Sequence, residues 1–472
     1  MNRPIRMVAL VSMLMTLALM ANVSVSYLLQ ADYLTNRPEN RRVTDARFGQ
    51  DRGPIMVGNT PIAKSTQSGD RYKFQRSYPS GQLYAPVTGF YSFTYGASGL
   101  ESSMSSQLAG QDNSQFISRL INLASGAVPE GGTVETTLDA KAQKAAWTAL
   151  AGRKGAVVAI DYTTGKVLAL VTSPSYNPND LATHDLTAAT AAWKKLNADP
   201  DKPMANRATR EIYPPGSTFK LITASAALES GLTSDSQVDA TSYKLPGSTK
   251  VIAENCGGSS ITLTRALVTS CNPAFARLGV KLGDEALREE ASKFGFGSTY
   301  VPDLGSVASR FPDELDPAQT AMSAIGEFEV AATPLQMAMV SATIANDGVQ
   351  MEPYVVNRVL DSELRVTSQT TPTKRAQVVS AQTAAELRKM MVAVVSSGTG
   401  FRAQISGVTV GGKTGTANSD NKRNPYAWFT AWADNPTVAV CAFVEDADIP
   451  ATEIAGGRVA APIAKAVIEA LR

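Results

Sequence analysis

The sequence contains a single histidine and almost no excess of charge of either sign. Its 44 lysines and arginines are nearly balanced by 42 aspartates and glutamates, so the formal net charge is only +2. Proteins that bind nucleic acid concentrate positive charge in patches or stripes, and we therefore expect no nucleic-acid partner. A Ser-His-Asp hydrolase would have to use His184, which lies beside the loop-like segment Asn177–Asp180. The scarcity of histidine argues against that class of active site.

Cysteines are equally few. Cys256, Cys271 and Cys441 do not have the spacing of metal ligands, and the chain contains no His-Glu-x-x-His pattern. We therefore expect neither a bound metal nor a cofactor. Cys441 falls within an apolar stretch and is predicted to lie in the core.

Charged residues are absent from Met7–Ala31. This run exceeds the roughly 20 apolar residues that a membrane-spanning helix needs. Arg3 and Arg6 before it and Asp32 after it favour a cytoplasmic N-terminus and an extracytoplasmic remainder. A cleaved signal peptide with Ser24–Ser26 as its cleavage site is the alternative, but its apolar region is usually only about 7–15 residues long. We predict an uncleaved, single-pass anchor in the cell membrane.

The composition divides the chain into three parts. Residues 1–31 form the cytoplasmic tip and the anchor, 32–130 a small N-terminal pedestal domain, and 131–472 the domain that carries the chemistry. The middle part is polar and rich in turns, and no set of potential catalytic groups stands out in it. Residues 101–115, rich in serine, glycine and glutamine, are predicted to be a surface loop or linker.

One segment of the last part places a hydroxyl and an amine on the same face of a helix. Pro214 and Pro215 cannot continue a helix from behind, and Gly216 allows a tight entry. An apolar run follows, so we predict a central helix over about Ser217–Ser230. Residues three apart share a face, which lets the Lys220 amine reach the Ser217 hydroxyl. Burial lowers the pKa of a lysine and allows it to act as a base for a serine nucleophile. Alone, Ser-x-x-Lys is a common chance match.

Two further motifs follow it along the chain. Ser270-x-Asn272 lies between a predicted helix capped by Thr262 and another that opens at Pro273; alone, it reads as a cap and a turn. Lys413-Thr414-Gly415 falls in a predicted strand over 408–417. Residues 407–414 also satisfy the phosphate-loop pattern, but such a loop follows a strand and runs into a helix. Here the would-be loop contains the strand, and 418–425 is too polar for a helix.

The remaining periodicity predicts a mixed fold. Residues 156–160 and 166–171 flank a turn and predict a β-hairpin. Residues 427–432 and 437–444 predict two more strands, and 316–340 is predicted to be helical. Glu327 lies in that apolar run, and we interpret it as a partly exposed helix end rather than a functional residue.

The three motifs occur together, in this order, in penicillin-binding proteins and serine β-lactamases. The chain resembles the class B penicillin-binding proteins from the anchor to the C-terminus, especially the small PBPA-type members. Further segments carry the same resemblance: Arg52–Ile55, Tyr78-Pro79, Asp139 with Gln143, Tyr213–Lys220 and Thr333–Ala338. The resemblance implies an α+β fold, with a five-stranded antiparallel sheet covered by helices and an all-helical subdomain beside it.

The resemblance also implies a peptidoglycan D,D-transpeptidase and assigns the catalytic roles. Ser217 would attack the D-Ala-D-Ala carbonyl of a stem peptide, with Lys220 as general base. Ser270 would relay the proton to the leaving amine, and Asn272 would orient Lys220 and the substrate amide. Lys413 would supply a nearby cation that lowers the pKa of Lys220.

The strand that follows Lys413 would bind the substrate. Thr414 and Thr416, with Gly415 between them, would hold the terminal carboxylate. The backbone N–H groups of Ser217 and Thr416 would form the oxyanion hole. Cys256 and Cys271 lie close in sequence to this site; they are either a disulfide that braces the Ser270 loop or two buried free thiols.

The implied partners are peptidoglycan stem peptides on lipid II-derived strands, β-lactams, the cytoplasmic membrane and a RodA- or FtsW-like glycosyltransferase. Three alternatives stay open at this point. A D,D-carboxypeptidase or β-lactamase-like hydrolase would use the same motifs, a β-lactam sensor would be acylated without turnover, and a membrane scaffold would not react at all.

Overall fold

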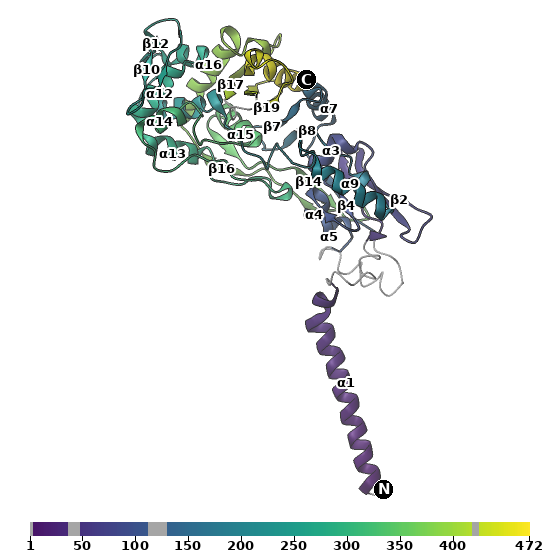
Figure 1. Cartoon of the computed structure of the whole chain (residues 1–472). Helices are drawn as coiled ribbons and strands as arrows, with labels where there is room; N and C mark the ends of the chain where they lie inside the picture. Colours follow the sequence, from purple (N-terminus) through teal and green to yellow (C-terminus); the bar gives the residue numbers. More distant parts are fainter. Residues whose placement is uncertain (1–2, 36–47, 112–129, 418–423) are drawn as a thin grey trace.

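The computed structural model describes residues 3–35, 48–111, 130–417 and 424–472 (Figure 1). The apolar run forms helix α1 (Arg3–Thr35). Its segment Arg3–Ser26 has a mean hydropathy of 2.1, and none of it is buried inside the protein. A helix of this length and composition can cross a membrane.

A six-stranded sheet forms the framework of the pedestal. Its strands, in spatial order, are β15 (Val366–Gln369), β14 (Val356–Leu360), β6 (Thr133–Thr136), β1 (Ile55–Val57), β2 (Thr60–Gln67) and β3 (Phe74–Ser77). Neighbouring strands are antiparallel except β1 and β6, which are parallel. Three of the six strands come from beyond residue 130. The sheet therefore takes strands from both sides of the boundary expected there, and the division into 32–130 and 131–472 stays a prediction.

The prediction of a loop over 101–115 is wrong for residues 101–103 and 105–108, which are helical. Glu101 lies in α4 (Gly99–Ser103) and is fully buried. Its carboxylate accepts hydrogen bonds from Arg52 (3.0 Å), Arg76 (2.6 Å) and the Tyr78 hydroxyl (3.1 Å). Burial raises the pKa of Glu101, but the two guanidinium groups more than offset this and hold it below its usual value. Residues 112–115 lie outside the described parts of the chain.

Glu101→Gln should destabilise the pedestal by about 3–5 kcal/mol, because it leaves two buried guanidinium groups without their counter-charge. Urea unfolding of the full-length protein in detergent, followed by tryptophan fluorescence, would measure this as a lower midpoint. Glu363→Gln is the matched control, since Glu363 is 63% exposed. Equal midpoints for the two variants would contradict the structural role of Glu101.

A second, five-stranded sheet lies at the centre of the last part of the chain. Its order is β17 (Val410–Ala417), β18 (Tyr426–Ala433), β19 (Val438–Asp446), β7 (Lys154–Asp161) and β8 (Val167–Ser173). All four pairings are antiparallel. This confirms the predicted sheet, including the hairpin that β7 and β8 form.

Both faces of this sheet are buried, and side chains alternate between two cores. Trp428 and Phe443 pack in the core that contains α15 (Pro334–Ala345). Phe429 and Val440 pack in the core that contains α7 (Ala140–Leu150) and α18 (Ala461–Ala470). Strands covered on both faces read as almost continuous apolar runs, as β18 and β19 do. Cys441 is buried in β19, as predicted.

A predominantly helical subdomain packs beside the sheet, at the left in Figure 1. It contains α10 (Lys220–Glu229), α11 (Leu263–Thr269), α12 (Asn272–Leu282), α13 (Asp284–Lys293), α14 (Pro317–Ser323) and α16 (Ala381–Ser397). It is not all-helical as predicted, because two short strand pairs decorate it: β9 (Gln237–Asp239) with β12 (Ser260–Thr262), and β10 (Tyr243–Lys244) with β11 (Val251–Ile252).

The predicted helix over 316–340 is interrupted between α14 and α15. Gly326 there has a φ of 78°, and a Cβ at this position would lie 2.1 Å from the Gly216 carbonyl oxygen. The Gly326 carbonyl in turn accepts the Gly216 N–H at 3.0 Å. The break in the helix thus allows Gly326 to pack closely against the turn that carries Ser217.

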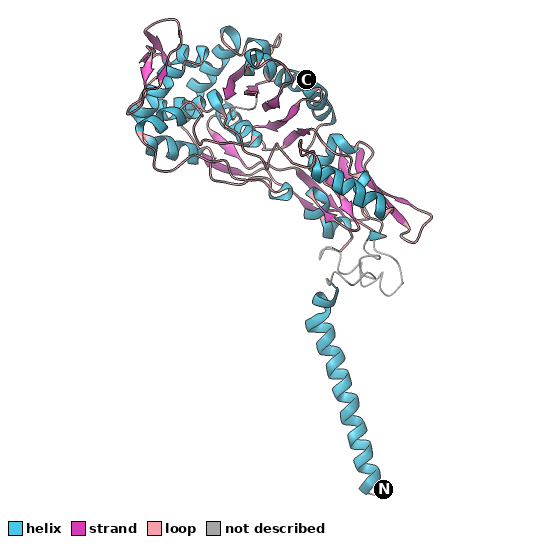
Figure 2. Ribbon diagram, in the orientation of Figure 1, coloured by secondary structure: helices cyan, strands magenta, loops and turns pink. Residues whose placement is uncertain are grey.

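Smaller elements complete the described chain (Figure 2). They are α3 (Gly81–Thr88), β4 (Tyr91–Ser92), β5 (Gly96–Ala97), α5 (Ser105–Leu108), α8 (Asn179–Ala182), α9 (Leu186–Ala198), β13 (Val349–Met351), β16 (Lys374–Gln377), α17 (Gly456–Val459) and the 3₁₀ turns η2 (Gly216–Thr218), η3 (Pro302–Leu304), η4 (Phe401–Ala403) and η5 (Ala451–Glu453).

Candidate active site

Ser217 lies on a 3₁₀ turn rather than within one continuous helix. The predicted helix over 217–230 begins as η2 and becomes regular only as α10. The turn is held against the central sheet: the Trp428 indole donates to the Pro214 carbonyl at 2.9 Å. Gly216 has a φ of 51°, and a Cβ there would lie 2.8 Å from the Thr416 carbonyl oxygen. Only glycine permits this close approach without strain.

Lys220 is fully buried directly behind the nucleophile. Its Nζ lies 3.0 Å from Ser217 Oγ, 2.6 Å from the Ser270 carbonyl oxygen and 2.5 Å from Asn272 Oδ1. A neutral amine has two hydrogens and one lone pair. The two carbonyl oxygens can only accept and take the two hydrogens, which leaves the lone pair for the Ser217 hydroxyl. This arrangement suits a general base.

Ser270 and Asn272 come from the junction between α11 and α12. Thr262 caps α11 as predicted, accepting the Arg265 N–H at 3.1 Å. Ser270 ends this helix in the left-handed region, with a φ of 58°. Residues held in that region are uncommon and concentrate at functional sites. The conformation presents both the carbonyl and the hydroxyl of Ser270 to lysines.

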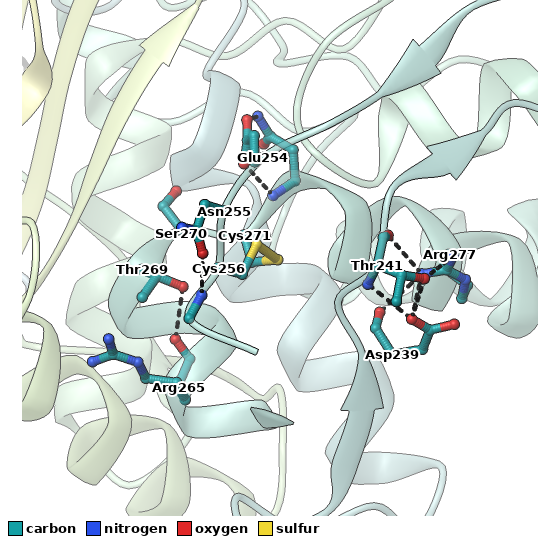
Figure 3. The surroundings of a disulfide bond; sticks show 12 residues. Asp239, Thr241, Glu254, Asn255, Cys256, Arg265, Thr269, Ser270, Cys271 and Arg277 are labelled. Atoms are coloured by element: carbon teal, nitrogen blue, oxygen red, sulfur yellow. Dashed lines mark hydrogen bonds and ion pairs between the residues drawn. A yellow bond between two sulfur atoms is a disulfide. The ribbon is translucent and has the colours of Figure 1, made fainter. Parts of the chain in front are cut away.

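Cys256 and Cys271 form a disulfide with a Cα–Cα separation of 5.5 Å. This settles the alternative left open by the sequence in favour of the bond. Because Cys271 stands between Ser270 and Asn272, the disulfide ties the junction to the loop that follows β11. Figure 3 shows this loop beside the turn that carries Ser270.

Lys413 approaches the same junction from β17. It is fully buried, and its Nζ donates to Ser270 Oγ and to the Thr414 carbonyl, each at 2.8 Å. Lys220 Nζ lies 3.3 Å from the same Ser270 hydroxyl. The structure therefore brings together the five catalytic residues that the sequence predicts, with Ser270 linking the two lysines.

Two cavities meet at Ser217. One, of about 540 Å³, extends past Thr414 and Thr416 to Arg402 and Arg458. The other, of about 300 Å³, extends past Glu327. Ser217, Glu254, Asn272 and Thr416 line both. Ser217 thus lines a groove that is formed by the two cavities together.

Two family profiles match this chain. The penicillin-binding protein transpeptidase domain matches residues 155–469, and the penicillin-binding protein A dimerisation domain matches residues 52–134. The chain is 42% identical to the peptidoglycan D,D-transpeptidase PbpA of Mycolicibacterium smegmatis, over 100% of this chain and 99% of the relative.

Solved structures agree. Penicillin-binding protein A from Mycobacterium tuberculosis, as the penicillin G acyl-enzyme complex, superposes with a TM-score of 0.85 at 41% identity, over 89% of this chain and 99% of the other. Its imipenem acyl-enzyme complex also gives 0.85, at 40% identity, over 90% and 99%. The chain belongs to the class B penicillin-binding proteins. The family, the α+β fold class and the transpeptidase class predicted from the sequence are confirmed.

In this penicillin-binding protein, burial is the largest cause of the shifted pKa values of Lys220 and Lys413. It lowers the pKa of Lys220 to about 7, while the charges of Glu254 and Glu327 act in the opposite direction. The predicted part of Lys413 in lowering the pKa of Lys220 stays a prediction. Burial and then the charge of Lys220 hold the pKa of Lys413 well below its usual value, with Glu254 again opposing. Keeping both of these buried amines protonated would cost free energy, because like charges this close repel each other.

Strand β17 of the penicillin-binding protein presents alternate residues to the groove. Thr414 and Thr416 line the larger cavity, and the Thr414 hydroxyl lies 2.7 Å from that of Thr399. Gly415 faces the Ser217 turn, where a Cβ would lie 2.8 Å from the Pro215 carbonyl oxygen. Its absence lets the turn approach the strand. A part for Gly415 in substrate binding stays a prediction.

Several residues of the groove escaped the sequence analysis. Glu327, interpreted there as a helix end, is half-buried and lines the smaller cavity. Glu254, Thr399, Arg402 and Arg458 were not singled out at all. Glu254 stands two residues before Cys256, so a Cys256–Cys271 disulfide, one of the two alternatives left open by the sequence, places it near Asn272.

The single histidine contacts residues of the pedestal rather than these motifs. His184 contacts Asp70 and packs on Tyr72. The described residues contain no group of three or more histidine, cysteine or acidic side chains that could hold a metal.

Proposed function

We propose that this penicillin-binding protein is a peptidoglycan D,D-transpeptidase that works through an acyl-enzyme on Ser217. The observation that carries the proposal is the buried Lys220 amine, 3.0 Å from the Ser217 hydroxyl and with a pKa of about 7. Half of such amines are neutral near physiological pH, so a base is present without histidine. The Mycolicibacterium smegmatis relative is named for this activity.

Acylation begins when the Ser217 hydroxyl passes its proton to Lys220 Nζ and Oγ bonds to the carbonyl carbon of the penultimate D-Ala. The backbone N–H groups of Ser217 and Thr416 stabilise the oxyanion. As the intermediate collapses, the carbon–nitrogen bond breaks. The proton then moves from Lys220 through the Ser270 hydroxyl to the departing D-Ala amine.

Substrate orientation falls to β17 and to Asn272. Thr414 and Thr416, with Gly415 between them, receive the terminal carboxylate, and Lys413 supplies positive charge beneath it. Asn272 orients the Lys220 amine and the substrate amide. An acceptor amine on a second stem peptide then attacks the acyl-enzyme, and Ser217 recovers its proton. β-Lactams acylate Ser217 as mimics of D-Ala-D-Ala.

The position of the enzyme follows from α1. We place its N-terminus in the cytoplasm, α1 across the membrane as an uncleaved anchor, and both folded parts outside. A RodA- or FtsW-like glycosyltransferase would supply strands made from lipid II. The charge distribution around α1 supports this topology.

The proposal is tested by crosslinking. Full-length protein in detergent, mixed with nascent strands from a separate polymerase, should produce crosslinked muropeptides detectable by chromatography and mass spectrometry. The same protein acylated beforehand with penicillin G should produce none. Uncrosslinked strands together with rapid penicillin hydrolysis would identify a hydrolase, and stable acylation without either product would identify a sensor.

A further inference from the structure

Glu254 is a charged residue in the wall of the groove that the proposed mechanism does not use. It lies in the loop after β11, where its side chain is exposed and lines both cavities at Ser217. Figure 3 shows it beside the disulfide and the Ser270 turn. Glu254 is therefore within reach of the reacting groups without being one of them.

The Glu254 carboxylate accepts two hydrogen bonds from Asn272. Its Oε2 accepts the Asn272 backbone N–H at 3.0 Å, and its Oε1 accepts a hydrogen from Asn272 Nδ2. A carboxylate can only accept hydrogen bonds, whereas an amide side chain has a donor end and an acceptor end. The donor end of Asn272 must therefore face Glu254, and its Oδ1 must face the Lys220 amine, 2.5 Å away.

The disulfide fixes the two partners relative to each other. Cys256 follows Glu254 by two residues, and Cys271 immediately precedes Asn272. The Cys256–Cys271 bond therefore links Glu254 and Asn272 through a short stretch of covalent structure. This constraint limits how far an otherwise exposed loop can carry Glu254 from Asn272. The contact is thus built into the fold.

We propose that Glu254 is a positioning residue for acylation: by orienting the Asn272 amide, it holds the Lys220 amine in line with the Ser217 hydroxyl. This inference rests on the proposed function. The negative charge of Glu254 has a second consequence, for the pKa values of the two lysines. Glu254 raises the pKa of Lys220 and of Lys413 against the effect of burial, and Glu327 also raises that of Lys220. Lys250 and the two arginines of the larger cavity are the other charged groups that share cavity walls with Glu254.

Three variants of the full-length protein separate orientation from charge. Glu254→Gln keeps the length of the side chain but offers Asn272 only one acceptor atom and no charge. Glu254→Asp keeps the charge but is one methylene too short for both contacts. Glu363→Gln makes the same charge change at a position that is 63% exposed, in the turn between β14 and β15.

The readout is the second-order rate constant for acylation by a fluorescent penicillin, measured across pH. Glu254→Gln should lower the plateau rate by about 10- to 100-fold. This is the loss typical in metalloenzymes when a residue that orients a metal ligand is removed, and Glu254 orients Asn272 in the same indirect way. The fall of the rate constant on the acid side of the pH profile, its acid limb, should also move to lower pH in this variant. Loss of the carboxylate makes Lys220 easier to deprotonate. Glu254→Asp should lower the plateau while keeping the acid limb of the wild type, and Glu363→Gln should match the wild type in both.

A merely structural role would make Glu254→Gln lower the rate by one factor at every pH, with no shift of its pH dependence. That result, or wild-type rates for both Glu254 variants, would overturn the inference. Thermal unfolding and a count of free thiols establish that each variant is folded and keeps its disulfide. Ser217→Ala distinguishes the two proposals: if it still reacts, the proposed function fails, whereas unreactive Ser217→Ala with unaffected Glu254 variants defeats only the role of Glu254.

Discussion

Ser217→Ala should abolish covalent labelling of the full-length protein by a fluorescent penicillin and leave its fold intact. The hydroxyl is the only part of the side chain that can form the ester. Removing the nucleophile of a serine protease costs a factor of about 10⁶, which would place labelling below detection. Lys220 keeps its bonds to the Ser270 carbonyl and to Asn272, so the change leaves no buried group without a partner.

In-gel fluorescence and intact-protein mass spectrometry would measure the loss, with Ser106→Ala in the pedestal as the control. Ser106 is an exposed serine whose hydroxyl donates to Gln107, and its variant should label like the wild type. An adduct of undiminished yield on Ser217→Ala, mapped to another side chain, would remove Ser217 from the mechanism.

Features set by short spacings were predictable from the sequence. Lys220 stands three residues after Ser217, and the hairpin of β7 and β8 needs only two apolar runs and a turn. β17 could be distinguished from a phosphate loop because its glycines fall inside a strand pattern; residues 418–423 after it lie outside the described chain. That the motifs meet in one groove came from the resemblance, because no local pattern brings residues 217, 270 and 413 together.

Features that depend on distant partners were missed. Glu101 lies in a stretch with the composition of a loop, and its burial makes sense only with Arg52 and Arg76, which are 49 and 25 residues away. Glu254 is followed by Asn255, Cys256 and two glycines, a local context typical of a surface turn. β14 and β15 look like any hairpin, and only the tertiary fold returns them to the pedestal sheet. In each case the free energy comes from a contact that the local sequence does not contain.

The sharpest test of the base is Lys220→Arg. Arginine keeps the positive charge but cannot be deprotonated in a protein, so general-base catalysis is lost while a cation remains. General-base catalysis contributes about 10²–10⁴-fold, and we expect the acylation rate constant to fall toward the upper end of that range, because the larger guanidinium must also fit a fully buried site. Stopped-flow acylation with penicillin G would measure it. Lys220→Met, neutral and close in length, should lose a similar factor.

The pH dependence then identifies the group that titrates. Lys220 is the free amine above its pKa of about 7, so wild-type acylation should fall as the pH falls through that value. The slow residual reactions of Lys220→Arg and Lys220→Met should lack this acid limb, since neither side chain loses a proton there. If the limb persists in both variants at the same pH, another group supplies the base. Lys413, the second buried amine at Ser270 Oγ, would then be the residue to replace.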